Sequence, residues 1–299
     1  MSTNEKPEQQ ARVERWKPLL EKLSDIPTLP VVAMRVTELI NDPNSSSADI
    51  ADVLKKDQVL TAKVLKLINS PYYGIPGEVT DIKRALAYLG FNTLAQLVLS
   101  ISVVGAFSES MPSRFSMQHF WKHALGTAVA SEIIAKKTGY PKPEEAFTCG
   151  LLHDIGKIVL LKIAPDEFLR IIQLTEKEKI SFYEAERRLE VPNHGYLGEY
   201  IANQWRLPMV IRMCVRYHHA DVRKMDTILA SMKNAVQIVA LANEIMVKEN
   251  IGFSGNASGG NITDDLLAPL GLSASELPPL IERIKKEIDN ASGFLGAAA

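Results

Sequence analysis

Positions 153–157 read His153-Asp154-Ile155-Gly156-Lys157, and this short stretch lies at the end of a predicted helix. Imidazole nitrogens and carboxylate oxygens are common metal ligands, so the adjacent His153 and Asp154 form a candidate ligand pair. Lys157 lies about one helical turn further on, where its ammonium can meet the charge of a phosphate. The same sequence is also compatible with a purely structural arrangement, in which a histidine lies at a helix end and the following aspartate caps the next turn. The motif alone therefore leaves a structural role open.

The remaining histidines fall on separate predicted helices. His123 lies on a helix predicted over 118–138, His194 begins one over 194–205, and His218-His219 end one over 208–219. Helical bundles build metal sites from inward side chains on facing helices. Neighbouring helix positions point about 100° apart, so one histidine of the adjacent pair can ligate while the other supports it or contacts a substrate.

These residues predict a metal site in a helical core. Its expected ligands are His123, His153, Asp154, His194, and one or both of His218 and His219. Imidazoles with one carboxylate suit transition metals better than magnesium, so we expect one or two ions of iron, manganese or zinc, at full or partial occupancy. Two such ions can bridge a phosphate and generate a hydroxide, with Lys157 as the candidate catalytic residue that stabilises developing negative charge.

Apolar residues recur at helical spacing along nearly the whole chain, and no strand pair, repeat or heptad array stands out. In the first third, Ser47 and Thr80 are the expected caps of two helices, and Gly90 is expected to end the second of them. Further helices are predicted at 92–107, 118–138, 143–152, 165–179, 194–205, 208–219, 227–249, 262–270 and 275–288. The sequence predicts an all-α fold.

Composition narrows the class of protein. Of 299 residues, 46% are hydrophobic and 23% charged, with 34 basic side chains against 35 acidic ones, so no net charge attracts nucleic acid or anionic lipid. The first 16 residues lack the apolar core of a signal peptide, and the apolar run at 97–107 is too short to span a bilayer. Two cysteines provide no disulfide framework. We therefore expect a cytoplasmic protein without a membrane or nucleic-acid partner.

The order of the histidines resembles the HD superfamily of metal-dependent phosphohydrolases, and His-Asp-Ile-Gly-Lys is the form of its motif in the HD-GYP branch, which hydrolyses cyclic di-GMP. Other segments resemble the HDOD domain more closely: Ile26-Pro27-Thr28-Leu29-Pro30, the stretch 57–70, Pro71-Tyr72-Tyr73-Gly74, Phe120-Trp121-Lys122-His123 and Trp205-Arg206-Leu207-Pro208. The resemblance covers about residues 25–221. It implies a bacterial signalling module that acts by binding other molecules, since few members are demonstrated enzymes.

The resemblance also implies a domain organisation. An N-terminal extension, 1–24, precedes an HDOD domain over 25–222, with a helical lobe at 25–115 and an HD-like lobe at 116–222. The C-terminal helices, 223–299, complete the HD-like bundle. Within them, the stretch 253–260 is rich in glycine and serine and is expected to be a flexible connector.

One position departs from the superfamily pattern. HD enzymes complete their ligand set with an aspartate that follows Ile-Val-x-Leu-Ala, and this chain carries Asn243 there. An asparagine offers a carbonyl oxygen without charge, so metal binding is expected to weaken and hydrolysis to suffer more. The Gly139-Tyr140-Pro141 string precedes the His-Asp pair, whereas the namesake motif of the HD-GYP branch follows it, so we interpret the string as turn residues.

Two other readings of the sequence are weaker. The two short helices predicted between Ser47 and Ser70 could form a helix-turn-helix, but a packed helix pair with a solvated basic face explains them better. Cys149 lies one turn before His153 and could ligate, but a small buried cysteine is the more common case.

Two functions from different classes follow. The first is a regulatory module that binds a signalling protein or a small effector and keeps the metal as a structural element. The second is a phosphohydrolase acting on a nucleotide or cyclic dinucleotide, with Lys157 on the phosphate. Family resemblance and Asn243 favour the first.

Overall fold

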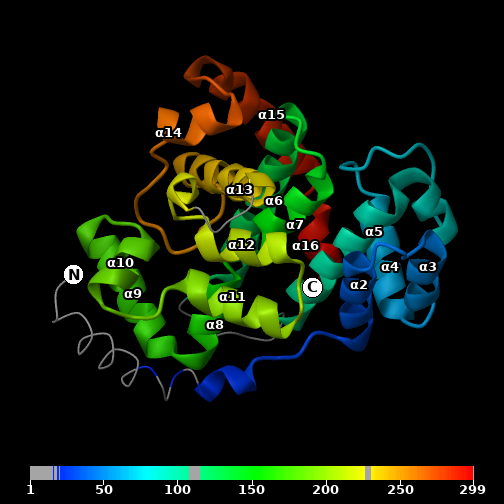
Figure 1. The fold of residues 1–299 in the computed structure, drawn as a ribbon, viewed down its shortest axis with the longest axis horizontal. Coiled ribbons are helices and arrows are strands. Elements are labelled where there is room, and N and C mark those ends of the chain that lie inside the picture. Colours follow the sequence, from blue (N-terminus) through cyan, green and yellow to red (C-terminus); the bar gives the residue numbers. More distant parts are fainter. Residues whose placement is uncertain (1–15, 17–18, 20, 108–114, 226–229, 299) are drawn as a thin grey trace.

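The computed structural model of the protein describes residues 16, 19, 21–107, 115–225 and 230–298 of the chain. These residues form helices and loops and contain no strand (Figure 1). The prediction of an all-α fold is therefore confirmed.

The first lobe packs three short helices against one long helix, on the right of Figure 1. Its elements are the 3-10 turn η1 (Lys22–Asp25), α2 (Val31–Asn41), α3 (Ser47–Leu54), α4 (Gln58–Ile68) and α5 (Ile82–Ala106). The caps predicted at Ser47 and Thr80 are each wrong by one residue. Ser46 and Asp81 accept the first-turn N–H groups instead, which leaves Ser47 inside α3. Gly90 interrupts α5 with a φ of 74°, as expected for a glycine that ends a helical segment.

The HD-like lobe is a bundle in which α6 packs along α7 and α13, while α11 packs against both α8 and α12. Its helices are α6 (Met117–Lys137), α7 (Pro143–Leu152), α8 (Ile155–Ile163), α9 (Pro165–Glu178), α10 (Phe182–Arg188), α11 (His194–Gln204), α12 (Met209–Tyr217) and α13 (Ala230–Lys248). The sequence did not predict α8 or α10. Almost every residue of α8 is buried, so its apolar side chains show no period, and α10 has only seven residues.

The C-terminal helices join the two lobes. They are α14 (Asp264–Leu267), α15 (Leu277–Asn290) and α16 (Gly293–Ala298). Of these, α15 packs on α6, whereas α16 contacts α4 and α5 of the first lobe as well as α6 (Figure 1). A hydrogen bond from the Tyr72 hydroxyl to Glu132 of α6 also connects the lobes.

Helix α5 is long and apolar enough to cross a bilayer by length and composition. However, 61% of its most apolar window is buried inside the protein, where it packs against α2, α4 and α7. A core helix passes the same test, so α5 is weak evidence for a membrane span.

The contact between α8 and α11 is closer than side chains allow. A Cβ atom added at Gly156 would lie 1.8 Å from the carbonyl oxygen of His194 and 2.7 Å from the backbone nitrogen of Gly198. Only hydrogen atoms fit there, so Gly156 holds the start of α8 against the start of α11. This approach brings Asp154 and His194 together.

We predict that Gly156→Ala lowers the free energy of unfolding by about 2–3 kcal/mol, because the new methyl group displaces backbone that cannot move cheaply. Alanine is the better helix former by about 1 kcal/mol, so any loss must come from packing. Urea unfolding measures the change. The matched control is Gly293→Ala at the start of α16, where nothing lies within 4 Å of the added atom. Equal stability of Gly156→Ala and the wild type would contradict the prediction.

Candidate metal centre

Four helix ends and one helix middle bring the predicted ligands to one point of the core. His153 directly follows α7, and Asp154 occupies the N-cap position of α8 without making a side-chain capping bond. His123 comes from the middle of α6, His194 from the first position of α11, and His218 from the end of α12. All five side chains are between 0% and 3% exposed. The carboxylate of Asp154 therefore faces imidazoles rather than its own helix.

The hydrogen bonds of two rings direct their Nε2 atoms inward. His153 Nδ1 lies 2.7 Å from the Gly150 carbonyl oxygen, and His218 Nδ1 lies 3.1 Å from the carbonyl oxygens of Cys214 and Val215. A carbonyl only accepts, so these Nδ1 atoms carry the hydrogen and the neutral rings present a bare Nε2. The Nε2 lone pair is the usual metal-ligating group of such a tautomer.

Asp154 lies between two sets of these rings. Its Oδ1 is 3.3 Å from His194 Nε2 and 3.4 Å from His218 Nε2, and its Oδ2 is 3.3 Å from His153 Nε2. Two sets of residues have ligand atoms within 4.8 Å of one another. The His194 group contains Asp154, His194, His218 and His219, and the His123 group contains His123, His153 and Asp154. The two groups share only the aspartate.

A cation fits this arrangement. The Nε2 atoms of His194 and His218 lie 3.2 Å apart, which is unfavourable for two bare lone pairs unless a proton or a metal lies between them. In addition, His153 Nε2, Asp154 Oδ1 and His219 Nε2 are buried without a hydrogen-bond partner among the described residues. Buried polar atoms are rarely left unpaired, and here the unpaired atoms are three ligand atoms at one place. The donor set suits a transition metal.

Protonation is a poor substitute for a metal. Burial lowers the pKa of His194 and His219 well below the ordinary value, and Lys157 and neighbouring histidines lower it further. Burial also lowers the pKa of His218. Burial alone would raise the pKa of Asp154, but His153 and Lys157 hold it well below its ordinary value. The centre therefore favours neutral imidazoles at His194, His218 and His219 and a charged carboxylate at Asp154, the protonation states that metal binding requires.

Lys157 does not face solvent. Its Nζ lies 2.7 Å from Asp154 Oδ2, 3.4 Å from Ser254 Oγ and 4.9 Å from the centre of the Phe182 ring. The ammonium is thus an internal counter-charge for Asp154, and a phosphate outside the protein cannot reach it in this arrangement. Its predicted catalytic role remains a prediction.

The stretch 253–260, expected to be a flexible connector, instead packs over the centre. The Phe253 N–H donates to the His119 carbonyl oxygen, and Asn256 accepts from the backbone of Phe182. A Cβ atom at Gly252, whose φ is +69°, would lie 2.3 Å from the backbone nitrogen of His123. We call residues 251–256 the covering segment. The prediction of flexibility failed because composition alone does not reveal these contacts with distant helices.

Asn243 and His219 lie at the two edges of the centre. Asn243 Oδ1 is 3.0 Å from Nε2 of His123, so the residue is at the predicted place, beside the His123 group. His219 is only partly buried, and its ring stacks at 5.0 Å on that of Tyr183, which is exposed. Cys149 is buried and free; it belongs to neither ligand group.

The sequence analysis missed Glu186 of α10. Its Oε2 lies 2.8 Å from His194 Nδ1, and its Oε1 accepts from the backbone N–H of the same residue at 2.7 Å. Burial raises the pKa of Glu186 well above the ordinary value, so its charge needs a positive partner nearby. A metal on His194 Nε2 would supply one through the ring. Glu186 lies eight residues before His194 on an unpredicted helix, and no motif marks it.

The chain is similar to known proteins. The family model of the HDOD domain matches residues 26–221. The chain belongs to the HDOD family. The resemblance expected from the sequence is thereby confirmed.

Three solved structures share the fold. An HDOD domain protein of unknown function from Geobacter sulfurreducens is 28% identical, with a TM-score of 0.74 and 97% of each chain covered. A candidate phosphohydrolase from Shewanella amazonensis SB2B is 24% identical, with a TM-score of 0.72 over 94% of this chain and 98% of that one. A candidate signal transduction protein from Marinobacter aquaeolei VT8 is 20% identical, with a TM-score of 0.77 over 98% of this chain and 65% of that one. The last two likenesses show the fold alone.

Among curated sequences, an uncharacterised protein from Treponema pallidum (strain Nichols) is 25% identical over 202 residues, 67% of this chain. The matched region spans 39% of that relative, so the HDOD protein corresponds to well under half of its length.

The lowered histidine pKa values predict an acid-sensitive HDOD domain when metal is removed with a chelator. Below about pH 6.5 the histidines of the unfolded chain bind protons while the buried ones do not, so stability falls as pH falls. Each such histidine contributes up to about 1.4 kcal/mol per pH unit. His123, whose pKa burial lowers to about 3, contributes over most of this range. Asp154 affects the pH dependence of stability only below about pH 4, the ordinary pKa of an aspartate in the unfolded chain.

Urea unfolding at pH 7.5, 6.5 and 5.5 measures this slope. We expect His123→Gln to reduce it, and His119→Gln, at an exposed position on the same helix, to leave it unchanged. A stability that is constant between pH 7.5 and 5.5 would show that the histidines are not buried in neutral form.

Glu186→Gln should weaken metal binding by about 10- to 100-fold, the usual effect of removing a carboxylate that orients a ligating histidine. The measurement is a competition titration with a chromogenic chelator. Glu184→Gln is the control, since Glu184 lies on the same helix and pairs with Arg187 and Arg188 at the surface. Equal metal affinity of Glu186→Gln and Glu184→Gln would show that Glu186 does not contribute to metal binding.

Proposed function

We propose that this HDOD protein is a regulatory module that acts by binding a signalling protein or a small effector, and that its metal centre stabilises the HD-like lobe rather than catalysing a reaction. The alternative is a phosphohydrolase acting on a nucleotide or cyclic dinucleotide. The two differ in whether a substrate reaches the centre.

The enclosure of the centre carries the proposal. Every member of the His123 group is buried, and in the His194 group only His219 is partly exposed. Lys157 is bonded to Asp154, and Ser254 of the covering segment lies on its other side at 2% exposure. A phosphodiester is larger than any gap such packing leaves, so hydrolysis would require the covering segment or α10 to move first. A structural metal requires no such movement.

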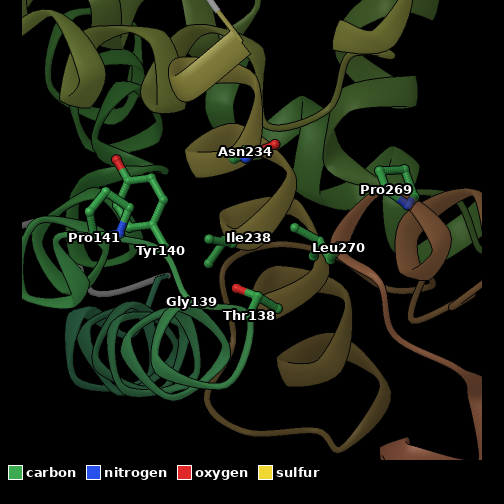
Figure 2. Close-up of a pocket in the computed structure, with 8 residues that line it drawn as sticks. All are labelled: Thr138, Gly139, Tyr140, Pro141, Asn234, Ile238, Pro269 and Leu270. Carbon is green, nitrogen blue, oxygen red and sulfur yellow. The ribbon is translucent and has the colours of Figure 1, made fainter.

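Two cavities among the described residues lie away from the centre. One of about 120 Å³ lies between the end of α6, α13 and the Pro269–Leu270 turn; Figure 2 shows Tyr140 and Pro141 on one side of it and Leu270 on the other. The other, of about 380 Å³, lies where Asn41 of the first lobe meets the start of α12 at Met209. The second has the size of small-molecule sites. It supports effector binding at the junction of the lobes.

Exposed aromatic side chains support binding of a protein partner. Tyr196 and Tyr200 are 42% and 39% exposed and lie one turn apart on α11, and Tyr183 of α10 is 37% exposed. Tyrosine is enriched in protein interfaces. Tyr183 also contacts the ring of His219, so a partner bound at Tyr183 would lie beside the one partly exposed residue of the centre.

The ligand set favours the alternative function. An aspartate and several imidazoles can hold an ion that activates water and polarises a phosphate. Under this hypothesis the covering segment opens to admit substrate, and Lys157 exchanges Asp154 for the phosphate.

The experiment compares stability with turnover. At a metal concentration about 100-fold above the dissociation constant, linkage adds about 2.7 kcal/mol to the free energy of unfolding. For a chain of 299 residues we expect the melting temperature to rise by about 4 °C with iron, manganese or zinc, and to fall on chelation. We expect metal-loaded protein to hydrolyse neither bis(p-nitrophenyl) phosphate nor cyclic di-GMP above the rate of a His194→Ala variant.

Metal-dependent turnover that His194→Ala abolishes would establish the phosphohydrolase and refute the regulatory proposal. A melting temperature that ignores metal would refute the structural role of the centre.

A further inference from the structure

The His194 group and the His123 group differ in how many of their ligand atoms are free. In the His194 group, Asp154 Oδ1 and His219 Nε2 have no hydrogen-bond partner among the described residues, and the Nε2 atoms of His194 and His218 face only each other and Oδ1. An ion there would replace only the contact between His194 Nε2 and His218 Nε2, and no hydrogen bond to a residue outside the group.

In the His123 group, two of three ligand atoms already have partners. His123 Nε2 pairs with Asn243 Oδ1 at 3.0 Å, and a ring that donates this hydrogen to an amide oxygen has no lone pair there for a metal. Asp154 Oδ2 pairs with Lys157 Nζ at 2.7 Å. Only His153 Nε2 is unpaired. An ion here must displace both an amide and an ammonium.

Charge balance gives the same result. The buried charges around the centre are Asp154, which is negative, Lys157, which is positive, and Glu186, which becomes negative when a metal on His194 balances its charge. With one divalent ion bound, the sum is then about +1, and a second ion would raise it to about +3. A buried excess of positive charge is costly because no water is present to solvate it.

We infer that the HD-like lobe binds a single divalent transition-metal ion in the His194 group, and that the Lys157 ammonium, together with Asn243, takes the place of a second ion in the His123 group. This rests on the proposed function, because it assigns the metal of that centre to one of two positions. Lys157 is then a fixed internal cation that neutralises the second oxygen of Asp154. Asn243 holds His123 in the tautomer that does not ligate.

The test counts bound ions in the full-length protein. Purified metal-free protein is titrated with Mn²⁺ by calorimetry, and electron paramagnetic resonance reports whether bound ions are isolated or coupled, since two ions about 3.5–4 Å apart interact magnetically. We expect the wild type to bind one equivalent with the spectrum of an isolated ion. Lys157→Met, which keeps the volume and removes the charge, should bind two equivalents with a coupled spectrum.

Asn243→Asp tests the inference without altering Lys157, in case Lys157→Met fails to fold. It replaces the neutral amide with a charged ligand beside His123, so total metal affinity should rise by at least about tenfold and a second equivalent should bind. The controls change surface residues of the same two helices, Lys162→Met on α8 and Asn234→Asp on α13. Both should bind one equivalent, like the wild type.

Two equivalents in the wild type, or one equivalent in both Lys157→Met and Asn243→Asp, would overturn the inference and leave the proposed function intact. No bound ion in any of these proteins would overturn both the inference and the metal centre of the proposed function. Hydrolysis by a wild type that holds one ion would refute the proposed function alone.

Discussion

A single buried carboxylate, that of Asp154, organises the HD-like lobe. In a core without water its charge must be balanced, and the protein balances it with the Lys157 ammonium on one oxygen and imidazoles from α11 and α12 near the other. The loop from α7 to α8 is fixed because Asp154 must reach this point, and Gly156 allows α11 to approach it closely. Without these partners, the Asp154 carboxylate would be an unpaired charge buried between helices α7, α8, α11 and α12.

The contacts that assemble the centre also enclose it. Glu186 orients His194 from α10, and the same short helix places Phe182 over Lys157. The covering segment follows α13 and packs its glycine backbone on α6, directly over His123. A site that is held so firmly is well suited to retain an ion and poorly suited to exchange a substrate. For this reason we propose a regulatory role even though the ligands of an enzyme are nearly all present.

Much of the site could be predicted, because metal chemistry uses few residue types. The histidines and Asp154 were identified from identity, order and helical placement, and the structure brings them together. Glu186 could not be found this way, since a glutamate on a short helix resembles any surface acid until its burial is known. The enclosure of Lys157 and the packing of the segment 253–260 could not be predicted for a similar reason. Lys157 is enclosed by Ser254 and Phe182, and Asn256 of the segment 253–260 accepts a hydrogen bond from Phe182. These residues are far apart in the sequence and come together only in the folded protein.

The sequence by itself determined the helical class, the family and the set of atoms available to a metal, because periodicity and residue chemistry are local properties. Tertiary structure alone decided which nitrogen of each ring faces inward, which oxygen of Asp154 stays unpaired and whether solvent reaches the centre. Those properties follow from contacts between helices, such as Glu186 with His194 and Asn243 with His123, and no local pattern encodes them.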